Sequence, residues 1–389
     1  MVEHPLGKGE VESSILSNST SPRAGHPKRL IYNEILHAGG HDADFRAGRP
    51  MTRRGILTGG TWCVDYNKLL DLWPAENGRA DILSIETSGG GSGCNMAIDI
   101  KRLDPRMPVA AIGLVGNDAG GQFLFAEADA HGIDRTQLTA TAETQTDFTD
   151  AFASQATGRR THISYFGTSH VLTPDHFDFS RSTHRFFHLG LPGIHKRMDA
   201  PWNGEANGWV ATLKKARAEG LATNMELASI ELERIAALVR PCLAHLDFLI
   251  VNDHEIGGIT GLATVRDGKT DVAACKTAAA AALKLGAGRL VAVHFPGGAV
   301  VAGRDGAALA MPSVKVPASA IAGANGAGDA FAAGFLYGLH EDWSLQDTLR
   351  LAHAAAAASL RRITTYGGVE SWPDCLALAK QWGWRETLQ

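Results

Sequence analysis

Residues Gly323–Leu339 read GANGAGDAFAAGFLYGL and combine a glycine-rich turn with an apolar, helical pattern. Glycine inside a helix costs about 1 kcal/mol relative to alanine, so the glycines at 326 and 328 are better explained by a turn that precedes the helix. Such a turn directs consecutive backbone N–H groups at one point, where the helix dipole adds positive charge. Asp329 would face the bound anion, and a carboxylate beside a phosphoryl group can accept the proton of an attacking hydroxyl.

Short apolar runs alternate with helical stretches over most of the chain. They lie near residues 56, 108, 185, 220, 247 and 289. This alternation predicts βα units on a mostly parallel sheet, which is an α/β fold. Residues 145–170 differ, because polar and apolar residues alternate there around a glycine-containing turn, as in an antiparallel hairpin or a small lid. We expect one domain over residues 53–389, with lid segments at roughly 64–90 and 145–170.

The composition favours a cytoplasmic protein that binds small molecules. Lys and Arg number 37 against 41 Asp and Glu, and no basic run typical of a nucleic-acid-binding arm is present. The five scattered cysteines lack C-x-x-C spacing, which argues against a disulfide framework or a zinc site. No apolar stretch approaches the ~20 residues of a membrane span. We therefore expect no nucleic-acid partner and no membrane association.

The first 50 residues differ from the rest of the chain. They are rich in Gly, Ser, Pro, His and charged residues and have little periodic apolar patterning. This composition predicts a disordered N-terminal extension. The basic residues that follow Met51 run directly into an apolar strand, so we treat Met51 as a candidate translation start.

Three other motifs follow predicted strands. The stretch TSGGGSGCNMAIDI at residues 87–100 places several glycines before Asn95, so that backbone and a short amide can approach a polyhydroxylated ligand. GLVGNDAGG, residues 113–121, forms another strand-to-helix turn. DFLIVNDHE ends a strand at Asn252 and places Glu255 three residues later, where oxygen groups can orient a hydrated magnesium ion.

These motifs, in this order, resemble the ribokinase or PfkB family of carbohydrate kinases. The resemblance covers residues from about 55 to 372, and also includes GRRTHISYFGTSHVLTP from Gly158, which is similar to the lid-return segment of the family. It implies a three-layer ribokinase-like fold with a small β lid. It also implies transfer of a phosphoryl group from ATP, with Mg²⁺, to a hydroxyl of a small sugar or sugar acid.

The resemblance assigns roles position by position. Asp329 would deprotonate the acceptor hydroxyl, and the turn Gly326, Ala327 and Gly328 would form the anion hole for the transferred phosphoryl group. The remaining implied residues bind the sugar (Asp65, Gly90, Gly91 and Asn95), the nucleotide (His294 and Gly298) and a magnesium ion through water (Asn252 and Glu255).

Two departures from the family pattern affect the nucleotide side. Gly323 and Ala324 stand where the family has an Asp-Thr pair, and because that aspartate often helps form a monovalent-cation site, activation by potassium is not expected. His294 and Pro296, in VHFPGGAVV, stand where threonine and glycine would be expected, so one contact to an ATP phosphate is lost or replaced.

Two other nucleotide-binding classes lack their motifs in this sequence, whereas two other functions remain open. RDGKT at residues 266–270 lacks the first glycine of a Walker motif, and ILTGGTWCVD lacks the G-x-G-x-x-G of a Rossmann oxidoreductase. A nucleoside kinase remains open, with Trp62 or Trp73 stacking on a base. A non-catalytic sugar-binding regulatory protein on the same scaffold also remains open. Many relatives dimerise through the lid, which makes a homodimer possible.

Overall fold

The structure is a computed structural model that describes residues 53–157, 160–228 and 230–388. The extension expected at residues 1–50 lies outside the described residues. None of the described helices is long and apolar enough to cross a membrane.

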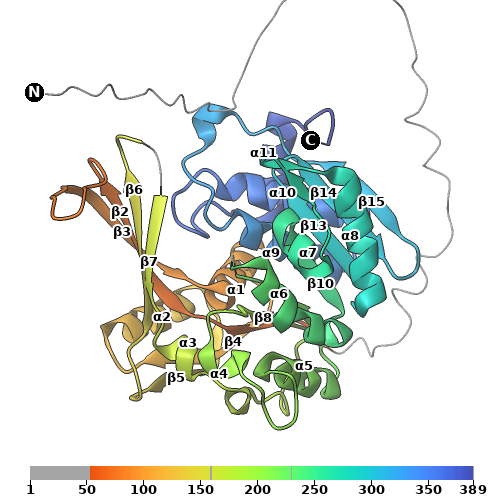
Figure 1. Cartoon of the computed structure of the whole chain (residues 1–389), viewed down its shortest axis with the longest axis horizontal. Coiled ribbons are helices and arrows are strands. Elements are labelled where there is room, and N and C mark those ends of the chain that lie inside the picture. Colours follow the sequence, from red (N-terminus) through yellow and green to blue (C-terminus); the bar gives the residue numbers. More distant parts are fainter. Residues whose placement is uncertain (1–52, 158–159, 229, 389) are drawn as a thin grey trace, which may run out of the picture. The chain divides into compact units, whose positions relative to one another are not determined.

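A nine-stranded sheet forms the centre of the molecule (Figure 1). Its strand order is β15-β14-β13-β10-β9-β8-β1-β4-β5. The strands from β13 to β5 in this order are parallel, whereas β14 and β15 are antiparallel additions at one edge. The strands span Ile56–Gly60 (β1), Val109–Gly116 (β4), Asp134–Thr141 (β5), Phe186–Gly190 (β8), Ala222–Met225 (β9), Phe248–Asn252 (β10), Leu290–Phe295 (β13), Gly298–Gly303 (β14) and Ala308–Pro312 (β15).

Helices cover both faces of this sheet, which confirms the expected three-layer α/β fold. One hydrophobic core joins the sheet to α1 (Ser92–Leu103), α2 (Ala119–Ala130), α9 (Ala327–His340), α10 (Leu345–Ser359) and α11 (Trp372–Trp382). The other core joins the opposite face to α5 (Gly208–Ala218), α6 (Leu232–Val239), α7 (Asp253–Thr260) and α8 (Val272–Leu285). Shorter elements are α3 (Thr168–Val171), α4 (Lys196–Asp199), the pair β11 (Val265–Arg266) and β12 (Lys269–Thr270), and three 3₁₀ turns, η1 (Pro174–His176), η2 (Arg240–His245) and η3 (Ala318–Ala320).

Strand β13 shows how the sequence specifies the two cores. Leu290 and Ala292 belong to the first core, whereas Val291 and Val293 belong to the second. Successive side chains of a strand point to opposite faces, so a strand covered on both sides is apolar throughout rather than alternating. The continuous run LVAV is therefore typical of a central strand.

Helix α9 is buried along its length, from Ala330 to His340. Two interior glycines allow it to approach α10 closely. A Cβ added at Gly334 would lie 2.9 Å from the Cα of Ala352, and one at Gly338 would lie 2.9 Å from the Cα of Thr348. The helix penalty of these glycines is therefore offset by backbone packing.

A second, four-stranded sheet projects from the main body as a lid (Figure 1). Its strand order is β3-β2-β6-β7, with β2 at Cys63–Leu70, β3 at Ile82–Gly90, β6 at Asp147–Ser154 and β7 at Arg160–Tyr165. Two antiparallel hairpins, β2–β3 and β6–β7, are joined by parallel pairing of β2 with β6. The lid thus combines two segments that are far apart in the sequence.

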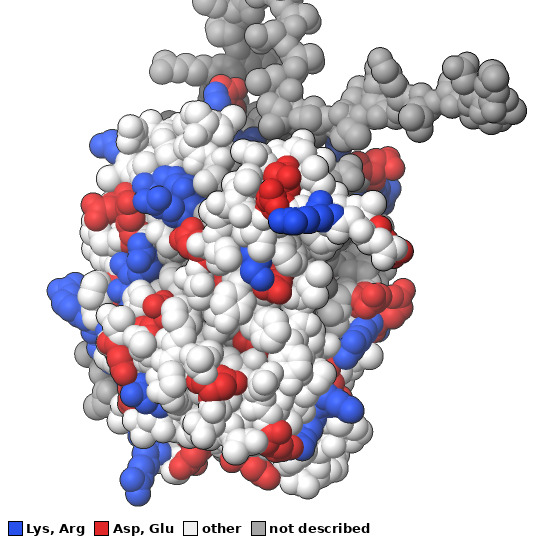
Figure 2. Space-filling model, turned by 90° about the vertical axis from the view of Figure 1, so that its left-hand side faces the viewer, with Lys and Arg blue, Asp and Glu red and all other residues white. Residues whose placement is uncertain are grey.

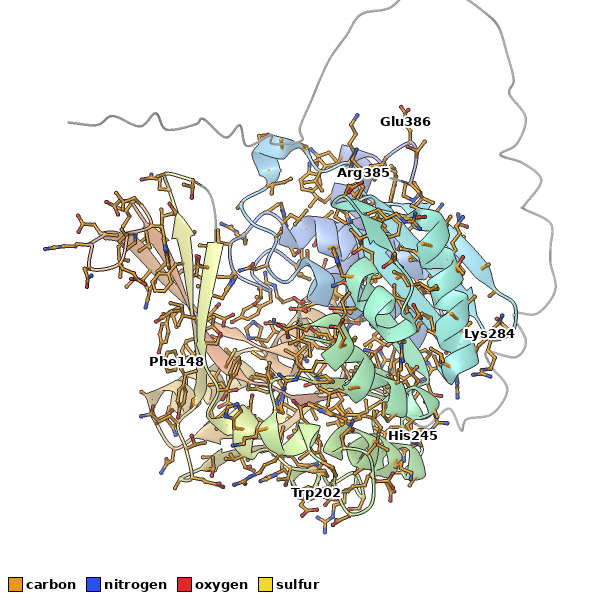
Figure 3. The ribbon with its side chains drawn as sticks, in the orientation of Figure 1. Phe148, Trp202, His245, Lys284, Arg385 and Glu386 are labelled. Carbon is orange, nitrogen blue, oxygen red and sulfur yellow. The ribbon has the colours of Figure 1, made fainter. Side chains whose placement is uncertain are left out.

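The two faces of the lid differ in polarity. Register places Asp65, Ser88, Thr149 and Ser164 in one row on the same face, and this face is polar. On the other face, the ring of Phe148 stacks on that of Tyr165 at a centroid distance of 5.5 Å, close to the base of the lid (Figure 3).

Polar bonds anchor the base of the lid to the main body. Asp147, at the start of β6, accepts hydrogen bonds from the backbone N–H groups of Gly167 and Ser169. Asp118, which caps α2, accepts bonds from both the backbone and the hydroxyl of Thr146. The backbone N–H of Gly116 also donates to the Thr146 hydroxyl at 2.8 Å, so Gly116 and Asp118 of GLVGNDAGG hold the base of the lid in place.

Candidate active site

The candidate site lies where the carboxyl ends of the parallel strands meet the N-terminus of α9. Ligands of open α/β sheets bind at this edge. Asn252, the last residue of β10, is paired in register with His294 near the end of β13. Glu226 directly follows β9. Residues that are distant in sequence are thus assembled by the sheet alone.

The start of α9 has the geometry predicted for an anion-binding turn. Its N-cap, Gly326, has a left-handed backbone conformation with φ of 74°, and no side chain caps the helix. The first N–H groups of a helix have no partner within it. The N–H of Ala327 makes a long turn bond of 3.4 Å to the carbonyl of Ala324, so the amides of Gly328 and Asp329 are the better donors to an anion.

Glycine is required at 326 by packing as well as by its φ. A Cβ there would overlap the carbonyl group of Thr365 and would lie 2.6 Å from its carbonyl carbon. At Gly328, a Cβ would meet the ring of His294 at 3.4 Å, an ordinary contact. The turn is therefore held between the Thr365 loop on one side and His294 on the other.

Asp329 is held by a buried chain of hydrogen bonds. Asn95 Nδ2 donates to Asp329 Oδ2 at 2.7 Å, and Thr365 Oγ1 donates to Asn95 Oδ1 at 2.9 Å. Asn95 is buried, with 4% of the residue exposed. Burial, then the nearby charge of Glu226 and a hydrogen bond with it, raise the pKa of Asp329 well above its ordinary value, although the bond from Asn95 opposes the rise.

Asp65 brings the polar face of the lid to the same site. Burial raises the pKa of Asp65 to about 7, with a smaller contribution from the charge of Asp329. A Cβ on Gly90 would overlap the Asp65 carboxylate, and one on Gly91, where φ is 86°, would lie 2.7 Å from the carbonyl oxygen of Thr61. Gly90 is therefore needed where β3 passes the Asp65 carboxylate, and Gly91 where the start of α1 packs on Thr61.

Asn252 and Glu255 satisfy each other in a capping box at the start of α7. The Asn252 side chain accepts from the Glu255 N–H at 2.8 Å, and Glu255 Oε2 accepts from the Asn252 N–H at 2.9 Å. This arrangement caps the helix and also fixes the glutamate. Burial raises the pKa of Glu255 to about 8, with a smaller contribution from Asp329.

The two residues expected to contact the nucleotide differ in their surroundings. His294 packs on Phe331 with ring centroids 4.9 Å apart, and burial lowers its pKa to about 4, so its ring is neutral at physiological pH. Gly298 begins β14, where a Cβ would be 3.2 Å from the Cα of Pro312 and would overlap the side chain of Leu388. The glycine at 298 is therefore also required by packing within the chain.

The sequence motifs missed three residues of this site. Thr365 orients Asn95, the charge of Glu226 helps to raise the pKa of Asp329, and His188 Nε2 lies 3.0 Å from Glu226 Oε2. A signal for Glu226 exists in the sequence, because it comes directly after the strand in GLATNMEL. Residues at the carboxyl ends of parallel strands tend to face the ligand.

The tryptophans considered for base stacking lie elsewhere. Trp62 is 1% exposed and belongs to the first core. Trp73 packs edge-on against Phe152, on the lid face opposite Asp65. The expectation that either ring stacks on a nucleoside base near Asp65 is therefore wrong.

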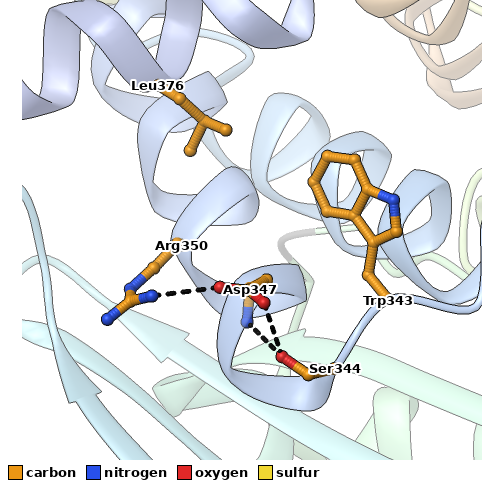
Figure 4. A pocket seen from close by; sticks show the side chains of 5 residues that line it. All are labelled: Trp343, Ser344, Asp347, Arg350 and Leu376. Atoms are coloured by element: carbon orange, nitrogen blue, oxygen red, sulfur yellow. Dashed lines mark hydrogen bonds and ion pairs between the residues drawn. The ribbon is translucent and has the colours of Figure 1, made fainter.

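Surface hollows outside this site have polar groups that pair among themselves. One of about 470 Å³ lies beside α10, where Asp347 bonds to Ser344 and Arg350 (Figure 4). Another, of about 440 Å³, is lined partly by Arg102 and Arg361, but both guanidinium groups donate to backbone carbonyls of residues 358–369. These bonds brace the loop that carries Thr365.

Basic and acidic side chains are interspersed on the face of the molecule shown in Figure 2. A nucleic-acid-binding surface would need a continuous basic patch. In the described part of the chain, no group of three or more His, Cys, Asp or Glu side chains is arranged to hold a metal ion.

The chain is similar to one known protein family and to several solved structures. The model of the pfkB family carbohydrate kinases matches residues 63–372. Among solved structures, Arabidopsis thaliana ribokinase complexed with ribose and ATP has a TM-score of 0.69 at 20% identity, covering 84% of this chain and 99% of that one. Fructokinase with bound ATP from Xylella fastidiosa has a TM-score of 0.65 at 20% identity, covering 85% and 99%. The nucleoside kinase of Methanocaldococcus jannaschii has a TM-score of 0.63 at 16% identity, covering 85% and 99%.

Proposed function

The chain belongs to the pfkB family of carbohydrate kinases, and from this premise we propose that it transfers the γ-phosphoryl group of ATP to a hydroxyl of a small neutral sugar. The observation that carries the proposal is the position of Asp329. Its carboxyl group is oriented by Asn95 and follows an uncapped, glycine-shaped helix start. A base and an anion site are therefore adjacent, as phosphoryl transfer requires.

Each residue of the site has a role in this proposal. Asp329 accepts the proton of the acceptor hydroxyl, and the amides of the 326–328 turn and of Asp329 itself stabilise charge on the transferring group. Asp65 and Asn95 bind hydroxyls of the sugar. The polar face of the lid closes over the acceptor and excludes water, which suppresses hydrolysis of ATP.

On the nucleotide side, we propose that His294 lies close to the phosphates and that Gly298 shapes the adjoining hairpin. Mg²⁺, when bound with the nucleotide, would neutralise charge on the β- and γ-phosphates. The residues fit this role, because Glu255 is fixed by its cap and is 8% exposed. Glu255 and Asn252 would hold water molecules of the ion rather than the ion itself.

The charge of the site favours a neutral sugar over a sugar acid. Four carboxyl groups converge here, those of Asp65, Glu226, Glu255 and Asp329. Besides burial, the pKa values of these four groups are shifted by one another and by a few neighbours, namely Asn252, Asn95, His188, Cys63 and Asp253. Neither Lys nor Arg is among these groups. A carboxylate on the acceptor would enter this environment without a cationic partner, which is costly.

A nucleoside kinase on the same scaffold is the second candidate, since a nucleoside kinase shares the fold. The position of Trp62 and Trp73 removes the stacking argument for it, so the neutral-sugar proposal is preferred. A non-catalytic sugar-binding protein is disfavoured because Asp329, its turn and the Asn252–Glu255 pair are all present with ordered geometry.

We also propose that the outer face of the lid forms a homodimer interface. Ile85 and Ile163 are 59% and 56% exposed there, and Tyr165 is 39% exposed. These side chains share the face of Phe148, opposite Asp65. A second copy of the chain would present the same apolar surface, as a twofold interface requires.

The test is ADP release from Mg-ATP with pentoses, hexoses, the matching sugar acids and nucleosides. Asp329→Asn keeps the shape of the site but removes the base, so we expect kcat to fall by about 10²–10⁴-fold with little change in sugar binding. Asp347→Asn is the matched control, because Asp347 is an exposed first-turn residue of α10. A near-normal rate for Asp329→Asn would exclude Asp329 as the base.

A further inference from the structure

One loop contacts three parts of the candidate active site. The Thr365 loop joins α10 to α11, and Thr365 Oγ1 donates to Asn95, the residue that orients the proposed base. A Cβ on Gly326 would overlap the carbonyl group of Thr365, so the loop also packs on the anion-binding turn. Tyr366 Oη accepts from the Gly89 N–H at 2.8 Å, near the end of lid strand β3. The position of this loop therefore affects the base, the turn and the lid together.

Two arginines hold the loop through its carbonyl groups. Arg102 Nε donates to the Val369 carbonyl at 2.6 Å, and its Nη2 donates to that of Gly367 at 3.2 Å. Arg361 Nη2 donates to the Gly368 carbonyl at 2.8 Å. A guanidinium group has five N–H donors, and two of them are on Nη1. Within the described residues, neither Nη1 group makes a hydrogen bond, so both arginines can bind a further acceptor.

The same arginines line a surface hollow of about 440 Å³ together with Arg362. Arg362 is exposed, and its side chain has no hydrogen-bond or ion-pair partner in the part of the chain that the structure describes. Among the described lining residues only Glu370 is acidic, and it pairs with Arg361 at 2.8 Å. The side chains of this pair are 28% and 42% exposed, and exposed ion pairs contribute little. The hollow therefore combines three guanidinium groups with one weakly held carboxylate.

The charge and the size of the hollow indicate a small phosphorylated ligand. A phosphate ester carries about 1.5–2 negative charges at pH 7, and the planar fork of arginine binds its oxygens bidentately. A hollow of about 440 Å³ accommodates a phosphate group with a small sugar attached. Gly367 and Gly368 also line it, and their lack of side chains lets a ligand approach the backbone of the loop. Free phosphate and a sugar phosphate share this chemistry.

We propose that this hollow is a regulatory site for a small phosphorylated ligand, which activates the enzyme by tying the Thr365 loop to α1. Arg102 lies about two turns after Asn95 on α1, so both side chains reach the loop from one face of the helix. Arg361 and Arg362 belong to the loop itself. A phosphate bound between them and Arg102 bridges the two elements that the Thr365–Asn95 bond connects. The activating effect rests on the kinase function proposed above, whereas the binding site does not.

The site can be tested without nucleotide or acceptor. Isothermal titration calorimetry in a phosphate-free buffer would compare inorganic phosphate with glucose 6-phosphate. We expect Arg362→Gln to weaken binding to the hollow at least about tenfold, because it removes charged hydrogen bonds to the phosphate. The anion-binding turn is unchanged in this variant, so the difference from the wild type reports the hollow alone.

A matched control removes a different exposed arginine. Arg350→Gln changes the net charge equally, beside the hollow at α10, and should bind both probes as the wild type does. Tighter binding of glucose 6-phosphate would identify a phosphorylated sugar as the ligand class, and equal binding would identify free phosphate. Wild-type affinity of Arg362→Gln for both probes, or the same loss in Arg350→Gln, would overturn the site.

The effect on the loop is measured separately. The tighter-binding probe should slow amide hydrogen exchange in the Thr365 loop of the wild type but not of Arg362→Gln. In the ADP-release assay it should raise the wild-type kcat about fivefold, with no response of Arg362→Gln relative to its own rate without the probe. Unchanged exchange, or unchanged kcat in an active kinase, would refute the activation. If no acceptor is phosphorylated but exchange slows, the kinase proposal fails and the anion site stands.

Discussion

Replacing Gly326 by alanine tests the anion-binding turn through its backbone geometry. The φ of 74° at Gly326 is in the left-handed region, which costs a residue with a Cβ about 1–2 kcal/mol. The new methyl group would also lie 2.6 Å from the carbonyl carbon of Thr365, whereas carbon atoms normally pack about 3.5–4.0 Å apart. The Thr365 loop or the turn must therefore move by about 1 Å.

This movement affects catalysis more than stability. Thr365 orients Asn95, which in turn orients Asp329, so a shifted loop misplaces the proposed base together with the amides of the turn. A misplacement of about 1 Å can cost about 10²-fold in rate. We expect Gly326→Ala to lower the free energy of unfolding by about 1–3 kcal/mol and to lower kcat by at least about 10²-fold.

Gly268→Ala separates the two effects. Gly268 has a φ of 71°, and a Cβ there would meet no heavy atom within 4 Å. This control carries the same backbone strain without the collision. Urea unfolding and ADP-release kinetics should show a loss of about 1 kcal/mol with unchanged kcat. Equal kcat values for the two variants would refute the argument that the turn needs glycine for catalysis.

Three other predictions follow. The pKa of Asp65 is raised from 3.8 to about 7, and those of Glu226 and Glu255 are raised from 4.5 to about 7 and about 8. The folded protein therefore holds these protons more tightly than the unfolded chain does. The resulting stabilisation is complete below the ordinary pKa values and is lost as the pH rises through 7–8. The Tm should therefore fall between about pH 7.5 and 8.5, above the range in which unfolded histidines, with an ordinary pKa of 6.5, still bind protons, and a rising Tm in differential scanning calorimetry would contradict this assignment. Ile163→Lys should shift the protein from dimer to monomer in light scattering with kinase activity retained, whereas an unchanged mass would exclude the lid interface. Asn95→Ala should raise the KM for the sugar and lower kcat by about tenfold or more, and unchanged steady-state constants would place Asn95 outside the site.

Much of the fold was predictable because it depends on local patterns. Apolar runs such as LVAV in β13 indicate strands covered on both faces, and the glycines before Asn95 and Asp329 indicate helix starts. These patterns arise from backbone periodicity and from φ requirements, which a single segment displays by itself. The central sheet and the helices on its two faces, which together make the three layers, follow from these patterns.

The surroundings of Asp329 could not be predicted in the same way. His188 and Glu226 lie on separate strands, and their approach depends on strand order and register rather than on any short motif. Thr365 reaches Asn95 across 270 positions of sequence. Sequence also left open whether Trp62 or Trp73 stacks on a ligand or packs in the protein, because proximity to Asp65 in sequence does not reveal that Trp62 lies in the core and Trp73 packs on Phe152 of the lid.

The parallel pairing of β2 with β6 has a consequence for folding. The two strands start at Cys63 and Asp147, and β4, α2 and β5 of the main body lie between them in the chain. A parallel pair of this sequence separation closes a long loop and forms slowly. Each hairpin alone is only marginally stable in water. The lid should therefore gain protection from hydrogen exchange after the main sheet during refolding, so that Asp65 joins the site as one of the last steps of its assembly.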